Sequence, residues 1–325
     1  MMAATGASVT VAGAGALGLC IALALARRGR EVVVLDPAAP GDNASGVAAG
    51  MLAPVFEAAL DPLSGDHLDL LRAARDAWPD FAPVAIDRTG AVWRGPDAGR
   101  IEARLDALGA RWRRTADGPF TDEDWRLDPG AAMTVLYAQA ARAGVRFETR
   151  PADPAEAGRL VVATGAGGAG LAPELARLTP IKGHILRVAG GPATGPVLRG
   201  EGVYLCPDPA AAILGATMET GRDDPRVDPD QVAALKQLGE TLWPGISALR
   251  ARAETGVRAG TADGLPLVGP SARPGVLLAA GARRNGWLLA PLVAGIIAAY
   301  LAGEDPGPWA ARLDPRRFDN KDKGE

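Results

Sequence analysis

The sequence predicts a chain of mixed α/β and α+β class, and three observations support this fold. The chain opens with a hydrophobic strand, a glycine-rich turn, an apolar helix and a second strand. A later strand enters another glycine turn at residues 159–168, and short β segments follow one another from 181 to 218 without a helix. Parallel strands with crossover helices therefore alternate with antiparallel hairpins. We expect a Rossmann-type domain interleaved with a mostly antiparallel β domain, the first from residues 1–82, 127–180 and 256–325 and the second from 83–126 and 181–255.

The opening unit has the spacing of a dinucleotide-binding turn. Its first strand leads into the letters GAGALG, and the strand after the helix ends at Asp36. Gly13 allows the tight turn, Gly15 lets the backbone approach a pyrophosphate, and Gly18 lets the helix pack closely on the strand. The free N–H groups at the start of the helix then face the phosphates. Because Asp36 lies where a ribose hydroxyl needs an acceptor, the unit favours dinucleotide binding.

The remaining elements follow from hydrophobic periodicity and from turn residues. Helices are expected at residues 65–78, 101–108, 129–144, 229–243 and 287–303. Strands are expected at residues 145–147, 159–163, 185–188, 202–206, 213–217 and 276–280. The last helix is apolar on nearly every side, which predicts that it is buried. Small residues at 43–54 allow the backbone to lie flat against a ligand.

Composition excludes several classes of protein. The chain has 325 residues, 48% of them hydrophobic, and a net charge of −3, which argues against a nucleic-acid or anionic-membrane surface. Cys20 and Cys206 are far apart and form no metal-ligand pattern, so we expect neither a disulfide nor a metal site. The N-terminus lacks the charged and apolar regions of a signal peptide, and no apolar run is long enough to cross a bilayer. We expect a cytoplasmic protein without a membrane partner.

Three longer stretches carry a family resemblance. They are the letters SGVAAGMLAP at 45–54, LGATME at 214–219 and RNGWLLAP at 284–291. With the opening unit, these stretches resemble the FAD-dependent D-amino acid oxidase family, and most of all its glycine oxidase branch, which serves thiamine biosynthesis. The resemblance covers nearly the whole chain. It implies an FAD-binding domain, a substrate-binding domain, and oxidation of glycine or a similar small amino acid to the imine with release of hydrogen peroxide.

The resemblance also implies which residues hold the cofactor. The ADP half would lie against the opening turn and Asp36, and the isoalloxazine against the loop that ends at Met51. The start of the last helix would face the flavin N1–C2=O edge, where a helix N-terminus stabilises negative charge. The implied cofactor residues are Gly13, Gly15, Ala16, Leu17, Gly18, Asp36, Ser45, Ala48, Ala49, Gly50, Met51, Thr164, Gly165, Arg284, Asn285, Gly286, Trp287 and Leu288.

For the substrate, the resemblance assigns Arg258 to the amino-acid carboxylate, which needs a cation if it is to be buried. A guanidinium can hold both carboxylate oxygens in one plane. Tyr204, Arg284 and Met51 match further substrate contacts, and we expect Arg283 to face solvent. His67 and His184 match no catalytic position, because hydride transfer from a neutral amine needs placement rather than a dedicated base.

Two departures from the family make substrate identity less secure than the cofactor. Segment 148–160 is shorter than the corresponding β-meander, which leaves the adenine contacts unassigned. Gly202 stands where glycine oxidases often have a histidine, two residues before the tyrosine. The family also implies a homo-oligomer, often a tetramer, and leaves open whether the imine passes directly to a thiazole synthase.

Several alternatives therefore stay open. Sarcosine, another N-alkyl glycine or a small D-amino acid would suit the same arginine, and a quinone or carrier would serve in place of oxygen as the electron acceptor. A flavin domain acting on modified tRNA shares the resemblance, but the acidic charge balance counts against it. A nicotinamide-dependent dehydrogenase would share the opening unit, but nicotinamide binding does not explain the stretches at 45–54 and 284–291, which favour a flavin.

Overall fold

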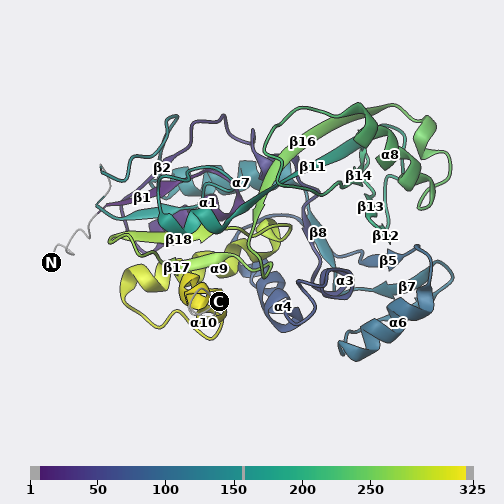
Figure 1. Cartoon of the computed structure of the whole chain (residues 1–325), viewed down its shortest axis with the longest axis horizontal. Helices are drawn as coiled ribbons and strands as arrows, with labels where there is room; N and C mark the ends of the chain where they lie inside the picture. Colours follow the sequence, from purple (N-terminus) through teal and green to yellow (C-terminus); the bar gives the residue numbers. More distant parts are fainter. Residues whose placement is uncertain (1–7, 156–157, 320–325) are drawn as a thin grey trace.

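The computed structural model describes residues 8–155 and 158–319. It shows a mixed α/β protein in which a largely parallel sheet lies at one end and a largely antiparallel sheet at the other (Figure 1). Two long strands, β11 (Thr179–Val188) and β16 (Ala251–Gly260), run between the two ends and pair with each other over their whole length. The predicted fold class is confirmed.

The largely parallel sheet has six strands in the order β17-β18-β10-β1-β2-β9. All neighbours are parallel except β17 and β18, so each parallel step needs a crossover that places helices on the sheet faces. Its strands are β1 (Val9–Ala12), β2 (Val32–Leu35), β9 (Arg146–Glu148), β10 (Leu160–Val162), β17 (Leu267–Pro270) and β18 (Val276–Ala280).

The largely antiparallel sheet has nine strands, in the order β15-β11-β14-β13-β12-β5-β7-β6, with β16 also paired to β11. Besides β11 and β16 it contains β5 (Ala91–Trp93), β6 (Arg113–Thr115), β7 (Gly118–Thr121), β12 (Val197–Gly200), β13 (Val203–Cys206), β14 (Ala212–Gly215) and β15 (Glu219–Thr220). A small third sheet joins β3 (Met51–Leu52), β8 (Trp125–Leu127) and β4 (Ile86–Asp87).

The helices agree with the predicted ones to within a few residues at most ends. The longer ones are α1 (Ala16–Arg27), α4 (Leu68–Asp76), α6 (Ala98–Ala107), α7 (Pro129–Arg142), α8 (Pro229–Glu240) and α9 (Gly286–Ala302). Short turns of helix are α2 (Ala44–Val47), α3 (Pro54–Leu60), α5 (Trp78–Phe81), α10 (Ala310–Leu313), η1 (Pro173–Arg177), η2 (Ile246–Ala248) and η3 (Pro315–Phe318). Asp128 caps α7 by accepting the Ala131 N–H at 2.8 Å.

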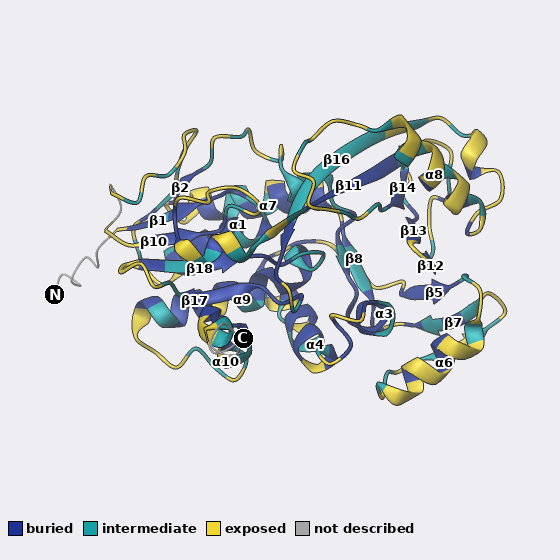
Figure 2. Ribbon diagram, viewed as in Figure 1, coloured by how far each residue is buried: buried dark blue, intermediate teal, exposed yellow. Residues whose placement is uncertain are grey.

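The core is concentrated around α1 and α9, which pack against each other over the six-stranded sheet. Figure 2 shows both as largely buried, whereas α6 and α8 carry long exposed faces. The expectation that the apolar last helix is buried is therefore confirmed. Within the described ranges, no helix combines the length and apolar character needed to cross a bilayer.

Candidate active site

The first of two neighbouring cavities lies at the carboxyl ends of the parallel strands. Its volume is about 550 Å³, and the turn at Gly13 and Gly15 forms one side of it. Asp36, at the end of β2, lies on the same wall and accepts the Ala14 N–H at 2.7 Å and the Ala38 N–H at 2.9 Å. This edge of a parallel sheet, where the strand order reverses, is where nucleotides bind in such folds.

The glycines of this turn leave room that any side chain would fill. A Cβ on Gly13 would collide with the Ala163 carbonyl, and a Cβ on Gly18 with the Gly13 carbonyl. Gly15 precedes α1 without a side-chain cap, and the Ala16 N–H donates to Ser45 Oγ at 3.0 Å. The helix therefore presents backbone donors to the cavity, which suits the pyrophosphate of a dinucleotide.

The glycine turn after β10, which lies beside the Gly13 turn, and the shortened segment also line the first cavity. Thr164 and Gly165 line the cavity, with Gly165 at a φ of 62°. Pro151 and Ala152 also line it near Asp36, although the sequence left this region unassigned. Their apolar surfaces suit the face of an adenine ring. The cavity thus fits a dinucleotide with its adenosine end near Asp36 and its pyrophosphate at α1.

A second cavity of about 600 Å³ shares part of its wall with the first. Ala44, Val47, Gly256 and Arg258 line both. The loop of Ala48, Ala49, Gly50 and Met51 forms one side of the second cavity. Ala48, Ala49 and Gly50 are small and leave room beside this wall for a flat ring such as the isoalloxazine of FAD.

The N-terminus of α9 lies between the two cavities. Gly286 lines the first, and Asn285 and Trp287 line the second. The Trp287 indole N–H donates to the Ser45 carbonyl at 3.0 Å, which ties this end to the loop before residues 48–51. Leu288 is buried within α9 and lines neither cavity, so only its backbone lies near the site.

Arg258 lies on β16 in the shared wall. Its Nη2 donates to the Thr217 carbonyl at 2.8 Å, and no carboxylate of the described residues forms an ion pair with it. Burial lowers the pKa of this guanidinium, because the charge is costly away from water. Burial likewise raises the pKa of Tyr204, which lines the second cavity, to about 12, so its hydroxyl stays protonated.

Arg284 lies at the cavity as expected, whereas Arg283 does not face solvent. Arg284 lines the second cavity, and its Nε lies 3.1 Å from Glu57 Oε1, which raises the pKa of Arg284. Arg283, expected to face solvent, forms a close ion pair with Asp61 and has a side chain that is only 17% exposed. That expectation was wrong, because the ion pair with the buried Asp61 holds the Arg283 side chain in the protein.

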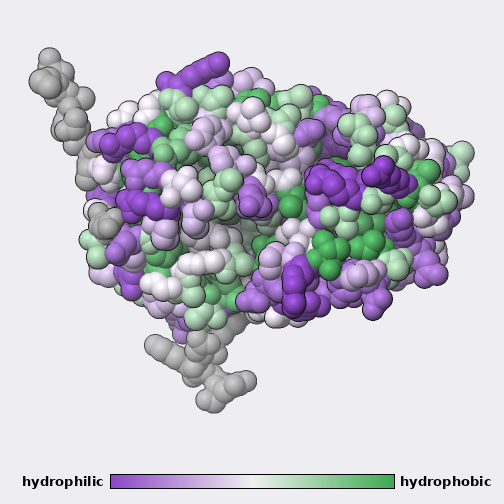
Figure 3. All heavy atoms as spheres, turned by 90° about the horizontal axis from the view of Figure 1, so that it is seen from above, coloured by the Kyte–Doolittle hydropathy of each residue, from purple (hydrophilic) through white to green (hydrophobic). Residues whose placement is uncertain are grey.

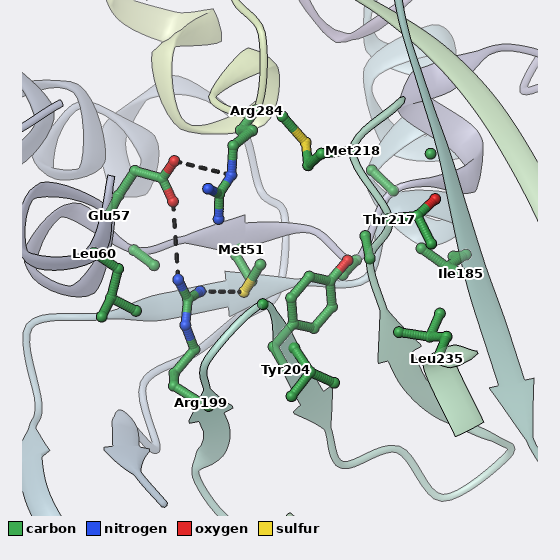
Figure 4. Close-up of a pocket in the computed structure, with 18 of the residues that line it drawn as sticks. Met51, Glu57, Leu60, Ile185, Arg199, Tyr204, Thr217, Met218, Leu235 and Arg284 are labelled. Carbon is green, nitrogen blue, oxygen red and sulfur yellow. Dashed lines mark hydrogen bonds and ion pairs between the residues drawn. The ribbon is translucent and has the colours of Figure 1, made fainter. Parts of the chain in front are cut away.

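Glu57 and Arg199 are cavity residues that the sequence did not indicate. Figure 4 shows Glu57 between Arg284 and Arg199, with the Arg199 guanidinium beside the Met51 sulfur. Arg199 Nη1 lies 3.0 Å from Met51 Sδ. Arg199 pairs directly with Tyr204 across β12 and β13. A β-hairpin predicted with its turn at residues 201–202 would have paired Arg199 with Tyr204, and directly paired side chains lie on the same face of a sheet.

His184 is structural, whereas Gly202 belongs to the cavity wall. The buried His184 accepts the Asp228 N–H on Nε2 at 2.9 Å and lies 3.0 Å from Glu219 Oε1 through Nδ1, and it lines neither cavity. Gly202 lines the second cavity with open space where a Cβ would stand. The cavity is therefore wider here than it would be with a histidine.

The second cavity opens beside apolar surface. Met218 and Leu238 line it and are both exposed. Figure 3 shows hydrophobic residues gathered in the right half of the upper face, on the side where Figure 1 places α8. Val227 and Trp243, which flank α8, are exposed as well.

The fold and the two joined cavities define a dinucleotide-dependent enzyme with a buried substrate site. Residues 8–300 match the family described as "FAD dependent oxidoreductase", and the chain belongs to that family. The protein is accordingly an FAD-dependent oxidoreductase, and the resemblance seen in the sequence is confirmed.

Individual relatives carry names of two different kinds. A "tRNA 5-methylaminomethyl-2-thiouridine biosynthesis bifunctional protein MnmC" of Maricaulis maris is 31% identical over 92% of this chain and 52% of its own length. A "Bifunctional protein ThiO/ThiG" of Trichormus variabilis is 29% identical over 95% of this chain and 55% of its own. The chain thus spans about half the length of these curated relatives.

Among solved structures, glycine oxidase from Geobacillus kaustophilus superimposes with a TM-score of 0.78. The two chains are 23% identical, and the superposition covers 95% of this chain and 98% of the other. This likeness establishes the shared fold.

Proposed function

We propose that this protein oxidises glycine, or a similarly small amino acid, at its carbon–nitrogen bond. The observation that carries the proposal is Arg258, a guanidinium without a carboxylate partner in the wall shared by the two cavities. Such a cation is costly unless an anion pairs with it. A substrate carboxylate bound there would place the adjoining Cα and amine beside the wall of residues 48–51.

The residues around the first cavity would hold the cofactor. The turn at Gly13, Gly15 and Gly18, with Ala16 and Leu17 at the start of α1, would hold the pyrophosphate, and Asp36 the ribose. Ser45, Ala48, Ala49, Gly50 and Met51 would lie along the flavin, with Thr164 and Gly165 on the nucleotide side. The α9 N-terminus, from Asn285 to Leu288, would stabilise negative charge at the ring edge.

When bound, FAD supplies the hydride acceptor for the amine oxidation and transfers the electrons onward. The protein residues act by placement. Arg258 fixes the carboxylate, and the Tyr204 hydroxyl, which stays protonated, is a donor or acceptor on the same wall. Arg284, held by Glu57, and Met51 close the side facing the ring. This placement converts a bimolecular encounter into a reaction between neighbouring atoms.

The comparisons support this class of substrate and leave its exact identity to experiment. The ThiO/ThiG name of one relative supports a role beside a thiazole synthase in thiamine biosynthesis, with the imine as the passed product. The MnmC name supports the rival in which the amine is attached to a modified nucleoside. Sarcosine, another N-alkyl glycine or a small D-amino acid would use the same Arg258. Oxygen as acceptor, a homo-oligomer and a cytoplasmic location remain predictions of the sequence.

Oxygen consumption and peroxide release test the proposal. The purified flavoprotein would be assayed with glycine, sarcosine, D-alanine and D-proline, and in parallel with a quinone dye under anaerobic conditions. Oxygen uptake with matching peroxide supports an oxidase, and dye reduction without oxygen uptake supports a dehydrogenase. Failure of every amino acid with both acceptors would overturn the proposal.

A further inference from the structure

Two oppositely charged side chains in the second cavity, Glu57 and Arg199, are only partly paired. Arg199 is 2% exposed, and among the described residues its guanidinium contacts Met51 Sδ at 3.0 Å and Glu57 Oε2 at 3.9 Å. Glu57 is 4% exposed, and its Oε1 lies 3.1 Å from Arg284 Nε. This ion pair does not have hydrogen-bond geometry, and no described residue donates a hydrogen bond to the Glu57 carboxylate. A thioether is a weak acceptor, and a buried carboxylate that accepts no hydrogen bond can accept one from a ligand.

This pair lies away from the proposed carboxylate site but in the same cavity. Arg258 is on β16 and Arg199 on β12, with β11, β14 and β13 between them. Tyr204, opposite Arg199 on the neighbouring strand, stands between the two arginines. Trp93 and Leu60 continue the wall past Arg199, and Gly202 leaves that side open. Glycine alone, bound at Arg258, would leave this part of the cavity empty.

We propose that Glu57 and Arg199 form a second substrate subsite, which binds the amine and a carboxylate carried on the amine nitrogen. The inference rests on the proposed function, because it takes Arg258 as the anchor of the first carboxylate. Glu57 accepts the amine N–H, so the nitrogen lies on the Arg199 side of the substrate. A substituent on that nitrogen then extends to Arg199, which donates to its oxygens.

The chemistry of the two side chains selects this substrate class. A guanidinium has five N–H donors arranged to meet two carboxylate oxygens, and Arg199 uses one of them on a sulfur. An N-methyl group offers no acceptor and would leave Arg199 as it is. The favoured substrate is therefore a glycine whose nitrogen carries a carboxymethyl or comparable acidic group, rather than glycine or sarcosine.

Redox-inert analogues test the subsite without turnover. Diglycolate and methoxyacetate resemble N-carboxymethylglycine and sarcosine, with an ether oxygen replacing the nitrogen, and calorimetry on the FAD-loaded protein gives both dissociation constants. The parent should bind diglycolate the more tightly. Arg199→Met should lower that preference by about 10- to 100-fold, as expected for a lost charge-assisted pair. Arg111→Met, an exposed arginine paired with Asp122, is the matched control and should keep the preference.

Kinetics with iminodiacetate, sarcosine and D-aspartate extend the test to the position of the second carboxylate. The ratio of kcat/KM for iminodiacetate to that for sarcosine should fall in Arg199→Met. If D-aspartate alone depends on Arg199, the subsite serves a Cα substituent and the inference is wrong. If Arg199→Met does not retain FAD, Arg199→Lys keeps the charge and should give an intermediate ratio.

The subsite and the proposed function fail in different ways. If Arg199→Met leaves the ratio of the two dissociation constants unchanged, whether or not both analogues bind more weakly, the subsite is overturned. Amine oxidation by the parent would not be affected by that result. A parent that oxidises no amine would overturn the proposed function, whereas an Arg199-dependent preference for diglycolate would still establish the binding site.

Discussion

Arg199, Arg258, Arg283 and Arg284 each line at least one of the two cavities, and they differ in their partners. Arg283 is paired with Asp61, Arg284 with Glu57, and Arg199 lies beside Glu57 and Met51. Arg258 alone among these four has no carboxylate partner. The sequence pointed to Arg258 and Arg284 through motifs. It missed Arg199 because this arginine lies outside any motif and enters the cavity only through strand pairing.

Replacing Arg258 by methionine should damage catalysis and leave the cofactor in place. Loss of one partner of a buried charge pair predicts a fall in kcat/KM of about 30- to 1,000-fold. The visible spectrum should still show bound FAD. Arg252→Met, an exposed arginine on the same strand, is the control and should remain near the parent value. Near-normal catalysis in Arg258→Met would remove the carboxylate assignment.

Asp124 should make stability depend on pH. Its carboxylate accepts the Val55 N–H at 2.7 Å and the Phe56 N–H at 3.0 Å, and burial raises its pKa to about 6. A carboxyl with a raised pKa stabilises the fold fully below its unfolded pKa and loses that contribution as pH rises through the folded pKa. Asp124→Asn has no proton to lose.

The free energy of unfolding of Asp124→Asn, relative to the parent, should therefore rise between about pH 3 and about pH 7, by up to about 3 kcal/mol. Denaturant titrations of both proteins across that range give the difference. Asp122→Asn, an exposed carboxyl, should show no such rise. A constant difference between Asp124→Asn and the parent would show that Asp124 titrates normally.

At the scale of elements, periodicity predicted the helices and the parallel strands well, because both are long or strongly apolar. The strand β16 was not among the predicted strands. Glycine is typical of turns, yet Gly256 and Gly260 both lie within this strand. A Cβ on Gly256 would stand 3.2 Å from Ala44 Cα, so the strand passes α2 at a close approach. Such a close approach has no local sequence pattern.

The turn before α1 depends on Gly18 for its packing. Gly18→Ala should force the Gly13 carbonyl to move, with a cost of about 1–3 kcal/mol and a lower FAD content after gel filtration. Gly295→Ala is the matched control, because Gly295 is an exposed glycine of α9 with nothing near its missing Cβ. That variant should gain about 1 kcal/mol. Equal melting temperatures and FAD contents for the two variants would contradict the account of the turn.

At the scale of the whole molecule, the two cavities are assembled from segments far apart in the chain. The sequence predicted two interleaved domains from alternating patterns. The six-stranded sheet takes its strands from residues 9–35, 146–162 and 267–280, and the nine-stranded sheet from residues 91–121, 179–220 and 251–260. The strand β16 runs through the expected division at 255/256, and the exact domain limits stay a prediction. The sequence could not show that the two cavities meet at Arg258, because that depends on how the sheets are placed.

The central claim is that an amino acid anchored by its carboxylate is oxidised at the joined cavities. An anaerobic titration of the purified flavoprotein tests it most directly, with the oxidised flavin absorption band as the readout. Glycine, sarcosine and iminodiacetate would be compared with methylamine, which lacks a carboxylate. At least one of the three amino acids should bleach the oxidised flavin band, and methylamine should not. A flavin that stays oxidised with all three, or that methylamine bleaches equally well, would contradict the central claim.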